Sequence, residues 1–221
     1  MGNKHCILDF ETLGTAIDGL SNQTVVSMAA IVFDEDITIQ ELMKLSFTEV
    51  VNKTFYVKFA LSSQKKGERF ERTVCTDTLA WWKKQKTEVK KELLPTKNDE
   101  HINVAINKFI TYLKESECKP KDMKMYSRGQ HFDLPILQNL CHTVDIDMHS
   151  NIVKYWNYRD LRSCLDELIG SGEFKLPDIL ENKFIKHDAR CDVAHELYML
   201  VFARALAMGE VTTEQLYKSN K

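Results

Sequence analysis

Two long apolar segments near the start of the chain have the length and composition of buried β-strands. The first, Lys4–Gly14, is apolar from Cys6 to Leu8 and then reaches two acids. The second, Thr24–Phe33, is apolar almost throughout, which is typical of a central strand covered on both faces. A polar turn over residues 14–23 separates them, so we expect the two strands to pair as antiparallel neighbours.

Three later segments show the apolar repeat of amphipathic helices, with apolar residues three or four positions apart. They are residues 99–115, 132–144 and 190–208. A further helix is predicted to follow Thr76-Asp77-Thr78, which can cap a segment that carries two adjacent tryptophans. Shorter helices are expected to begin at Arg159-Asp160 and in the tail that starts at Gly209.

Several shorter segments are less regular. Residues 37–60 are ambiguous, although Thr54–Phe59 has strand character. Met123–Ser127 and Ile152–Tyr158 are two more strand candidates, and residues 177–186 are predicted to be a connector. Residues 62–72 are polar and basic, which fits either a solvated loop or a flap near a phosphate backbone.

The composition is that of a soluble globular protein. The 221 residues are 43% hydrophobic and 28% charged, with a net charge of −2, so any nucleic-acid contact must use a local basic patch. The six cysteines include no Cys-x-x-Cys pair, which argues against a zinc site or a disulfide framework. The chain has neither a signal-peptide pattern nor an apolar segment of membrane-spanning length. We therefore expect a cytoplasmic protein.

Acidic residues gather at the predicted ends of three elements. Asp9 and Glu11 lie two positions apart, so in a strand their carboxylates leave on one face and repel each other. A divalent cation such as Mg²⁺ or Mn²⁺ would relieve that repulsion, although such a pair can also simply end a strand in a solvated loop. Asp133 opens a predicted helix, and His187 precedes Asp192 near the start of another. Four carboxylates and a histidine make a plausible two-metal hydrolytic centre with a general base.

These motifs resemble the DEDDh family of 3′–5′ exonucleases, and within it the bacteriophage exonuclease A group and related small exoribonucleases. The likeness runs from about residue 5 to 208 and is weakest over residues 12–50. The matching segments are Leu8-Asp9-Phe10-Glu11-Thr12, Lys58-Phe59 followed by Ser63-Gln64-Lys65, Trp81-Trp82-Lys83-x-Gln85, Arg128-Gly129-x-x-Phe132-Asp133-x-Pro135-Ile136-Leu137, Trp156-Asn157-x-Arg159-Asp160 and His187-Asp188. The resemblance implies an α/β fold, a ribonuclease H-like mixed sheet flanked by helices. It also implies a single exonuclease domain over residues 1–221.

The resemblance also implies roles for the acids and the histidine. Asp9 would touch two Mg²⁺ or Mn²⁺ ions, and Glu11 and Asp192 would bind the ion that activates water. Asp133 would hold the second ion, and His187 would act as the general base. Asp160 fits either a supporting position near the site or a helix N-cap, and His195 is expected to be a surface or core residue.

The substrate implied is a single-stranded nucleic acid with a free 3′ end. That end would lie against the backbone of Asp9-Phe10-Glu11-Thr12, with Leu13 and a ring of Trp81 or Trp82 as stacking surfaces. Phe132 is the remaining candidate for substrate binding. The preference for DNA or RNA stays open, with DNA favoured. No membrane partner is expected, and a homodimer is possible. Since the resemblance includes bacteriophage enzymes, the expected compartment is the host cytoplasm if a phage encodes the protein.

Two other functions fit parts of the sequence. Asp9-Phe10-Glu11-Thr12 and Asp188-x-x-x-Asp192 are similar to motifs of haloacid-dehalogenase-like phosphatases, but that family has an aspartate where Glu11 stands. It also has no use for Phe132-Asp133 or His187. A catalytically silent nucleic-acid-binding subunit is the non-enzymatic alternative, and the presence of all five functional residues argues against it.

Overall fold

A computed structural model of the chain describes residues 2–15, 21–129, 131–173 and 175–218. Among these residues five strands form one sheet in the order β3-β2-β1-β4-β5. The strands are β1 (Lys4–Thr12), β2 (Val25–Asp34), β3 (Phe55–Lys58), β4 (Met125–Ser127) and β5 (Tyr158–Asp160). β1 is antiparallel to β2 and parallel to β4, so the sheet is mixed, as the resemblance implied. Residues 16–20 of the predicted turn after β1 lie outside the described residues.

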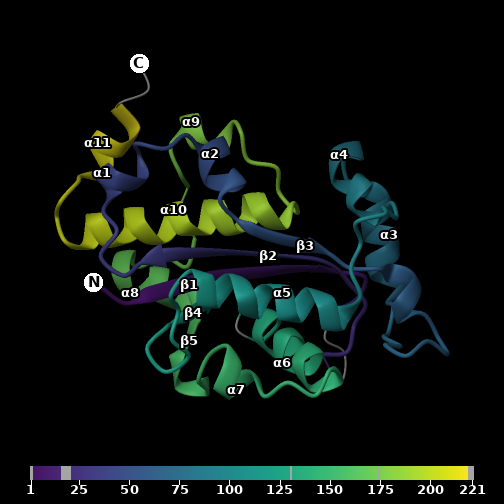
Figure 1. Cartoon of the computed structure of the whole chain (residues 1–221). Helices are drawn as coiled ribbons and strands as arrows, with labels where there is room; N and C mark the ends of the chain where they lie inside the picture. The colour runs from purple at the N-terminus through teal and green to yellow at the C-terminus, as the bar shows by residue number, and fades with distance from the viewer. Residues whose placement is uncertain (1, 16–20, 130, 174, 219–221) are drawn as a thin grey trace.

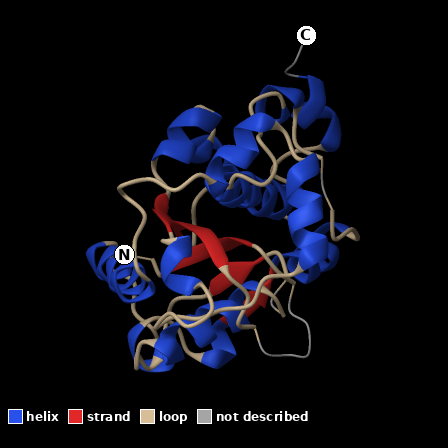
Figure 2. Cartoon of the chain, turned by 90° about the vertical axis from the view of Figure 1, so that its right-hand side faces the viewer, coloured by secondary structure: helices blue, strands red, loops and turns tan. Residues whose placement is uncertain are grey.

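Helices cover both faces of the sheet (Figures 1 and 2). One face packs on the long helix α10 (Ala189–Ala207) and on α8 (Leu161–Ile169). The other face packs on α5 (Ile102–Glu115) and α6 (Asp133–Thr143). Helices α3 (Thr76–Lys84) and α4 (Thr87–Lys90) stand at the end of the sheet where β1 finishes, on the right of Figure 1.

The remaining helices are short. They are α1 (Ile39–Leu42), α2 (Phe47–Asn52), α7 (Met148–Asn151), α9 (Asp178–Glu181), α11 (Thr213–Lys218) and the 3₁₀ segments η1 (Leu61–Gln64), η2 (Lys91–Leu93) and η3 (Tyr155–Asn157). No helix among the described residues has both the length and the apolar character needed to cross a bilayer.

Successive side chains of β1 point to opposite faces of the sheet. Cys6, Leu8 and Phe10 pack into the α5–α6 side of the core, whereas Ile7 packs on the α10 side. Asp9 and Glu11 have the parity of Ile7, so their carboxylates leave toward α10. The strand thus turns its acids toward the helix that carries Asp192.

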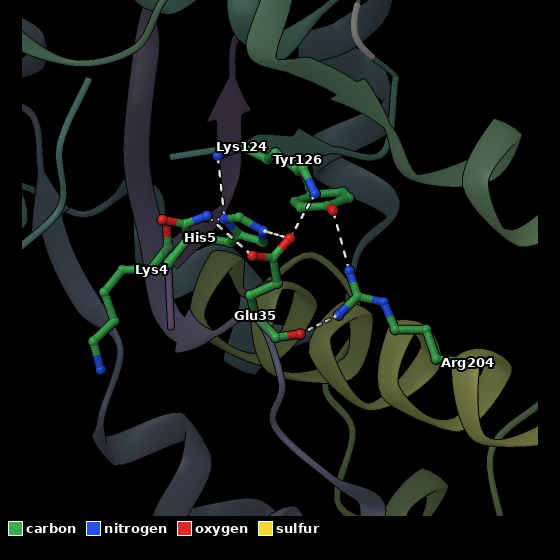
Figure 3. Close-up of polar contacts among 7 residues, drawn as sticks. Lys4, His5, Glu35, Lys124, Tyr126 and Arg204 are labelled. Atoms are coloured by element: carbon green, nitrogen blue, oxygen red, sulfur yellow. Dashed lines mark hydrogen bonds and ion pairs between the residues drawn. The ribbon is translucent and has the colours of Figure 1, made fainter. Parts of the chain in front are cut away.

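A polar cluster connects the C-terminal end of α10 to the edge of the sheet where β1 begins (Figure 3). Glu35, directly after β2, lies 2.8 Å from the Lys124 amine and 3.2 Å from the buried His5 ring. Arg204 of α10 donates to the Glu35 carbonyl oxygen and to the Tyr126 hydroxyl. Because this end of the helix is held over the start of β1, its N-terminal end lies over the end of β1, where the acids are.

The structure corrects two predictions of local structure. Of the predicted strand at residues 152–158, only Tyr158 is extended, as the first residue of β5; the residues before it follow α7 and contain η3. Ile152 and Val153 are buried nonetheless, because apolar character reports burial rather than extended backbone. The ambiguous stretch before β3 contains α1 and α2, each opened by a capping box, Thr38 with Glu41 and Ser46 with Glu49.

The second correction concerns the capping of α3. Its N-cap is Cys75, whose side chain makes no capping hydrogen bond, and Thr76 is the first helical residue.

The basic stretch of residues 62–72 contains both buried and exposed basic side chains. Arg72 is buried and donates to the carbonyl oxygens of Ser21 and Gln23, so it supports the fold. Lys65, Lys66 and Arg69 are exposed.

Candidate active site

The first two acidic motifs meet because β1 and β4 are parallel. Cys6 and Ile7 pair with Met125 and Tyr126, so the residues that follow the two strands arrive at the same edge of the sheet. Asp133, the first residue of α6, comes to that edge and is 3% exposed. Its Oδ1 accepts a hydrogen bond of 3.2 Å from the backbone N–H of Phe10. Residues 123 positions apart in sequence are therefore in direct contact.

The third motif reaches the same place from α10. Asp192 lies in the first turn of α10, and its Oδ2 accepts a 2.8 Å hydrogen bond from the backbone N–H of His187. His187 has a φ of +68°, an unusual conformation for a non-glycine residue. Because the backbone turns there, the imidazole faces β1, with Nδ1 3.8 Å from Glu11 Oε1.

Asp188 and Arg190 fix the start of α10. The Asp188 side chain caps the helix by accepting from the Arg190 N–H, and it also binds the Arg190 guanidinium with two contacts of 3.0 and 2.7 Å. Arg190 in turn lies over the Tyr56 ring, 4.6 Å from its centroid. This arrangement ties the segment next to His187 to β3, so the imidazole has a defined position.

The acids lie in a strongly unfavourable electrostatic setting. Burial raises the pKa of Asp9, Glu11, Asp133 and Asp192. The charge of Asp9 raises the pKa of the other three further, and the charge of Asp188 raises that of Asp9. Burial lowers the pKa of His187, with a smaller effect from the charge of Lys186, so its imidazole favours the neutral form. Neutral imidazole is the form that can accept a proton.

This donor set fits divalent cations. The ligand atoms of Glu11, His187 and Asp192 all lie within 4.8 Å of one another. Within the described part of the chain, Asp9 Oδ2 is buried without a hydrogen-bond partner. Carboxylate oxygens are the ligands that Mg²⁺ and Mn²⁺ prefer, and a cation would relieve the repulsion among the acids.

A cleft of about 650 Å³ is lined by Asp9, Glu11, Asp192 and His187. Phe10, Thr12, Trp81 and Phe132 also line it, and Asp133 lies next to it through its hydrogen bond with Phe10. The Trp81 side chain is 37% exposed and meets the His187 ring edge to face, with centroids 4.7 Å apart. Trp81 and Phe132 therefore present ring surface to whatever enters the cleft.

Leu13 and Trp82 do not offer the stacking surfaces that we expected. Trp82 is 1% exposed and its Nε1 donates to the Thr12 carbonyl oxygen. Leu13 packs beside it in a small apolar cluster. Adjacent positions on a helix point in different directions, so one tryptophan of the pair is in the core and the other is in the cleft.

Two uncertain residues have structural roles. His195 is buried, lies 3.0 Å from Glu181 and stacks on Phe184, which fits the expected core position. Asp160 is the N-cap of α8 and accepts from the Ser163 N–H.

Sequence reasoning missed several charged residues that line the cleft. They are Asp77, Arg128, Arg162, Glu173, Lys186 and Glu196. Glu196 could have been found, because it lies four positions after Asp192 and so shares its face of the helix. No sequence pattern pointed to the basic residues, because they lie in different segments of the chain and meet only in the fold.

A ribonuclease H-like sheet with acids from three elements and a histidine at one edge defines a class, the DEDDh 3′–5′ exonucleases, which depend on divalent metal ions. The chain belongs to the 3′–5′ exoribonuclease Rv2179c-like domain family, whose sequence profile matches residues 4–201. An exodeoxyribonuclease of Enterobacteria phage T4 is 30% identical over 216 residues, covering 92% of this chain and 90% of that protein. The protein is therefore a 3′–5′ exonuclease, and the phosphatase and silent-subunit alternatives are set aside.

Solved structures support the same fold. The nuclease domain of 3′hExo, a DEDDh family member bound to rAMP, superposes with a TM-score of 0.55 at 13% identity and covers 94% of each chain. Cell-death related nuclease 4 gives 0.56 at 16% identity, with 94% of this chain and 65% of that one covered. A product-bound exonuclease I gives 0.56 at 14% identity, where this chain is 95% covered but spans 45% of the longer protein.

Proposed function

We propose that the protein hydrolyses single-stranded nucleic acid from its 3′ end and releases 5′-mononucleotides, with DNA as the favoured substrate. In this proposal Asp9, Glu11, Asp133 and Asp192 hold two Mg²⁺ or Mn²⁺ ions, and His187 is the general base. The observation that carries it is the meeting of Asp9, Glu11, Asp192 and an accessible imidazole in one cleft, with the buried Asp133 held beside it by the Phe10 backbone.

Each protein group has a defined task in this scheme. Bound divalent ions supply Lewis-acid stabilisation of phosphate oxygens and a more acidic water. Asp9 and Asp133, joined through the Phe10 backbone, fix the oxygens that face the phosphate. His187 is 30% exposed and favours the neutral form, so it can take a proton from water beside Glu11. The T-shaped contact with Trp81 limits rotation of the imidazole.

The charges around the cleft support a nucleic-acid substrate. Arg128, Arg162 and Lys186 line the cleft together with Trp81 and Phe132. Cations of this kind bind phosphate oxygens, and ring surfaces stack on bases without sequence preference. In the proposed complex the 3′-terminal nucleotide lies against Phe10 and Thr12, whose backbone borders the acids.

A second groove extends from the cleft and fits the rest of the strand. It has a volume of about 550 Å³ and shares Lys186 and His187 with the cleft. Lys86, Val89 and Ile185 also line it. The helices beside it carry several lysines within nine residues, at positions 83, 84, 86, 90 and 91. We infer that the nucleotides preceding the 3′ end lie along this basic groove.

Charge reversal tests the proposed strand path. Lys86→Glu is expected to weaken binding of a long single strand while leaving hydrolysis of a dinucleotide near wild type. Since one phosphate contact is lost, the salt dependence of log K should become less steep by roughly 0.7. Lys66→Glu, on the exposed loop after η1, is the matched control. If Lys66→Glu had the larger effect, the strand would follow the loop of residues 62–72 instead.

One relative with a known substrate class supports the preference for DNA. That protein is a phage exodeoxyribonuclease, aligned over 92% of this chain, whereas the matching family is described as exoribonucleolytic. The homodimer stays a prediction.

Matched oligonucleotides test polarity and sugar preference together. With Mg²⁺, a 5′-labelled single strand should shorten stepwise to a ladder, and the DNA strand should be degraded faster than an RNA strand of the same sequence. A circular single strand, which has no 3′ end, is the control and should stay intact. Early release of a labelled mononucleotide from the 5′ end would refute the proposed polarity, and faster loss of the RNA would reverse the sugar preference.

A further inference from the structure

Glu196 is a buried acid that the five-residue centre leaves unexplained. It lies on α10 four residues after Asp192, so both side chains leave the same face of the helix. Glu196 is 3% exposed and lines the cleft. Its Oε2 is buried and, among the described residues, has no hydrogen-bond partner. A carboxylate in this position is costly unless a positive charge compensates for it.

The surroundings of Glu196 are mostly negative. Burial raises its pKa well above the ordinary value, and the charges of Asp9, Asp192 and Asp133 raise it further. Arg128 opposes this effect. In the described part of the chain, however, the Arg128 guanidinium contacts Met199 Sδ and the Glu173 carboxylate, and no hydrogen bond or ion pair joins it to Glu196. Arg128 is therefore not the direct partner of the Glu196 carboxylate.

Asp9 offers the complementary half of a site. Among the acids around Glu196, Asp9 has the largest charge interaction with it. Asp9 Oδ2 is also buried and lacks a hydrogen-bond partner among the described residues. Two unpartnered carboxylate oxygens, one from β1 and one from α10, thus border the same cleft. A cation between them would satisfy both.

We propose that Glu196 is a fifth carboxylate ligand of the metal centre and binds the ion that Asp9 holds. This proposal rests on the proposed function, because it takes Asp9 as a metal ligand. Two divalent cations and Arg128 together balance the charges of Asp9, Glu11, Asp133, Asp192 and Glu196. Without the ions, the five carboxylates repel one another.

The isosteric variant Glu196→Gln tests this role, because it removes the charge and keeps the shape. Calorimetric titration of Mn²⁺ into the metal-free enzyme is expected to give roughly 10- to 100-fold weaker binding than wild type. The metal-free variant should melt at a higher temperature than metal-free wild type, because one repelling charge is gone. The gain in melting temperature on adding Mn²⁺ should be smaller. Glu210→Gln, at an exposed position just after the same helix, is the control and should match wild type.

Two outcomes would overturn the proposal. One is wild-type Mn²⁺ affinity in Glu196→Gln. The other is a lower melting temperature of the metal-free variant with an unchanged gain from Mn²⁺, which would mean that Glu196 serves to neutralise Arg128.

If Glu196→Gln fails to fold, a second variant, Glu196→Asp, keeps the charge on a shorter side chain. The Mn²⁺ affinity of Glu196→Asp should then be lower than that of wild type and of Glu210→Gln, and higher than that of a variant that lacks a metal ligand. Wild-type affinity in Glu196→Asp would also overturn the proposal. A wild-type enzyme that bound no divalent ion would instead contradict the proposed function itself.

Discussion

Replacing Asp9, Asp133 or Asp192 by asparagine is expected to lower the rate of 3′-end hydrolysis by several orders of magnitude. Each change keeps the size of the side chain and removes an anionic oxygen from a site built of buried and partly buried acids. The amide cannot supply the charge that holds a divalent cation, so affinity for Mn²⁺ should fall together with the rate. Digestion of a 5′-labelled single strand and calorimetric titration of Mn²⁺ measure the two effects.

Stability separates this loss from misfolding. Because burial and repulsion raise the pKa of all three carboxylates, removing one charge should leave the metal-free protein at least as stable as wild type. In wild type, added Mg²⁺ or Mn²⁺ should raise the melting temperature, and EDTA should abolish both this gain and activity. Asp36→Asn, at an exposed position after β2, is the control. Full activity of the three variants would contradict the assignment of the metal ligands.

The His187→Ala variant should be impaired through proton transfer instead. Loss of a general base costs roughly 10²–10⁴-fold in rate. Wild-type activity should decline when the pH falls below the lowered pKa of His187, since protonated imidazole cannot accept a proton. His187→Ala should lack that transition, and its residual rate should rise with pH because hydroxide replaces the missing base. A pH series of initial rates measures both profiles.

The metal affinity of His187→Ala distinguishes a general base from a metal ligand. The Nδ1 or Nε2 of His187 lies within reach of a cation held by Glu11 and Asp192, so the geometry alone also fits a metal ligand. A general base predicts that His187→Ala keeps the Mn²⁺ affinity of wild type, whereas a ligand predicts a loss as large as that of Asp192→Asn. His131→Ala is the control, because His131 is exposed and next to Phe132. His195→Ala is unsuitable, since its ring packs on Phe184 and lies within hydrogen-bond distance of Glu181.

Local patterns were reliable where a single element determines the geometry. The alternation of β1 put Asp9 and Glu11 on one face, and the apolar repeats located α5, α6 and α10 to within a few residues. The position of Asp133 at the start of a helix also follows from local sequence. Patterns were weak where an element is short: the three-residue β5 overlaps the predicted strand only at Tyr158, because its pairing with β4 decides its extent.

By itself, the sequence determined the family and singled out the acids and the histidine of the candidate site, together with most of the elements that carry them, because period and motif spacing are properties of the chain. The tertiary structure decided which of these groups meet. It put Trp82 in the core and Trp81 in the cleft, left Leu13 beside Trp82, and brought Glu196 and Arg128 to the acids. These outcomes depend on which face of one element packs against another, and that choice is made by burial and charge across the whole fold.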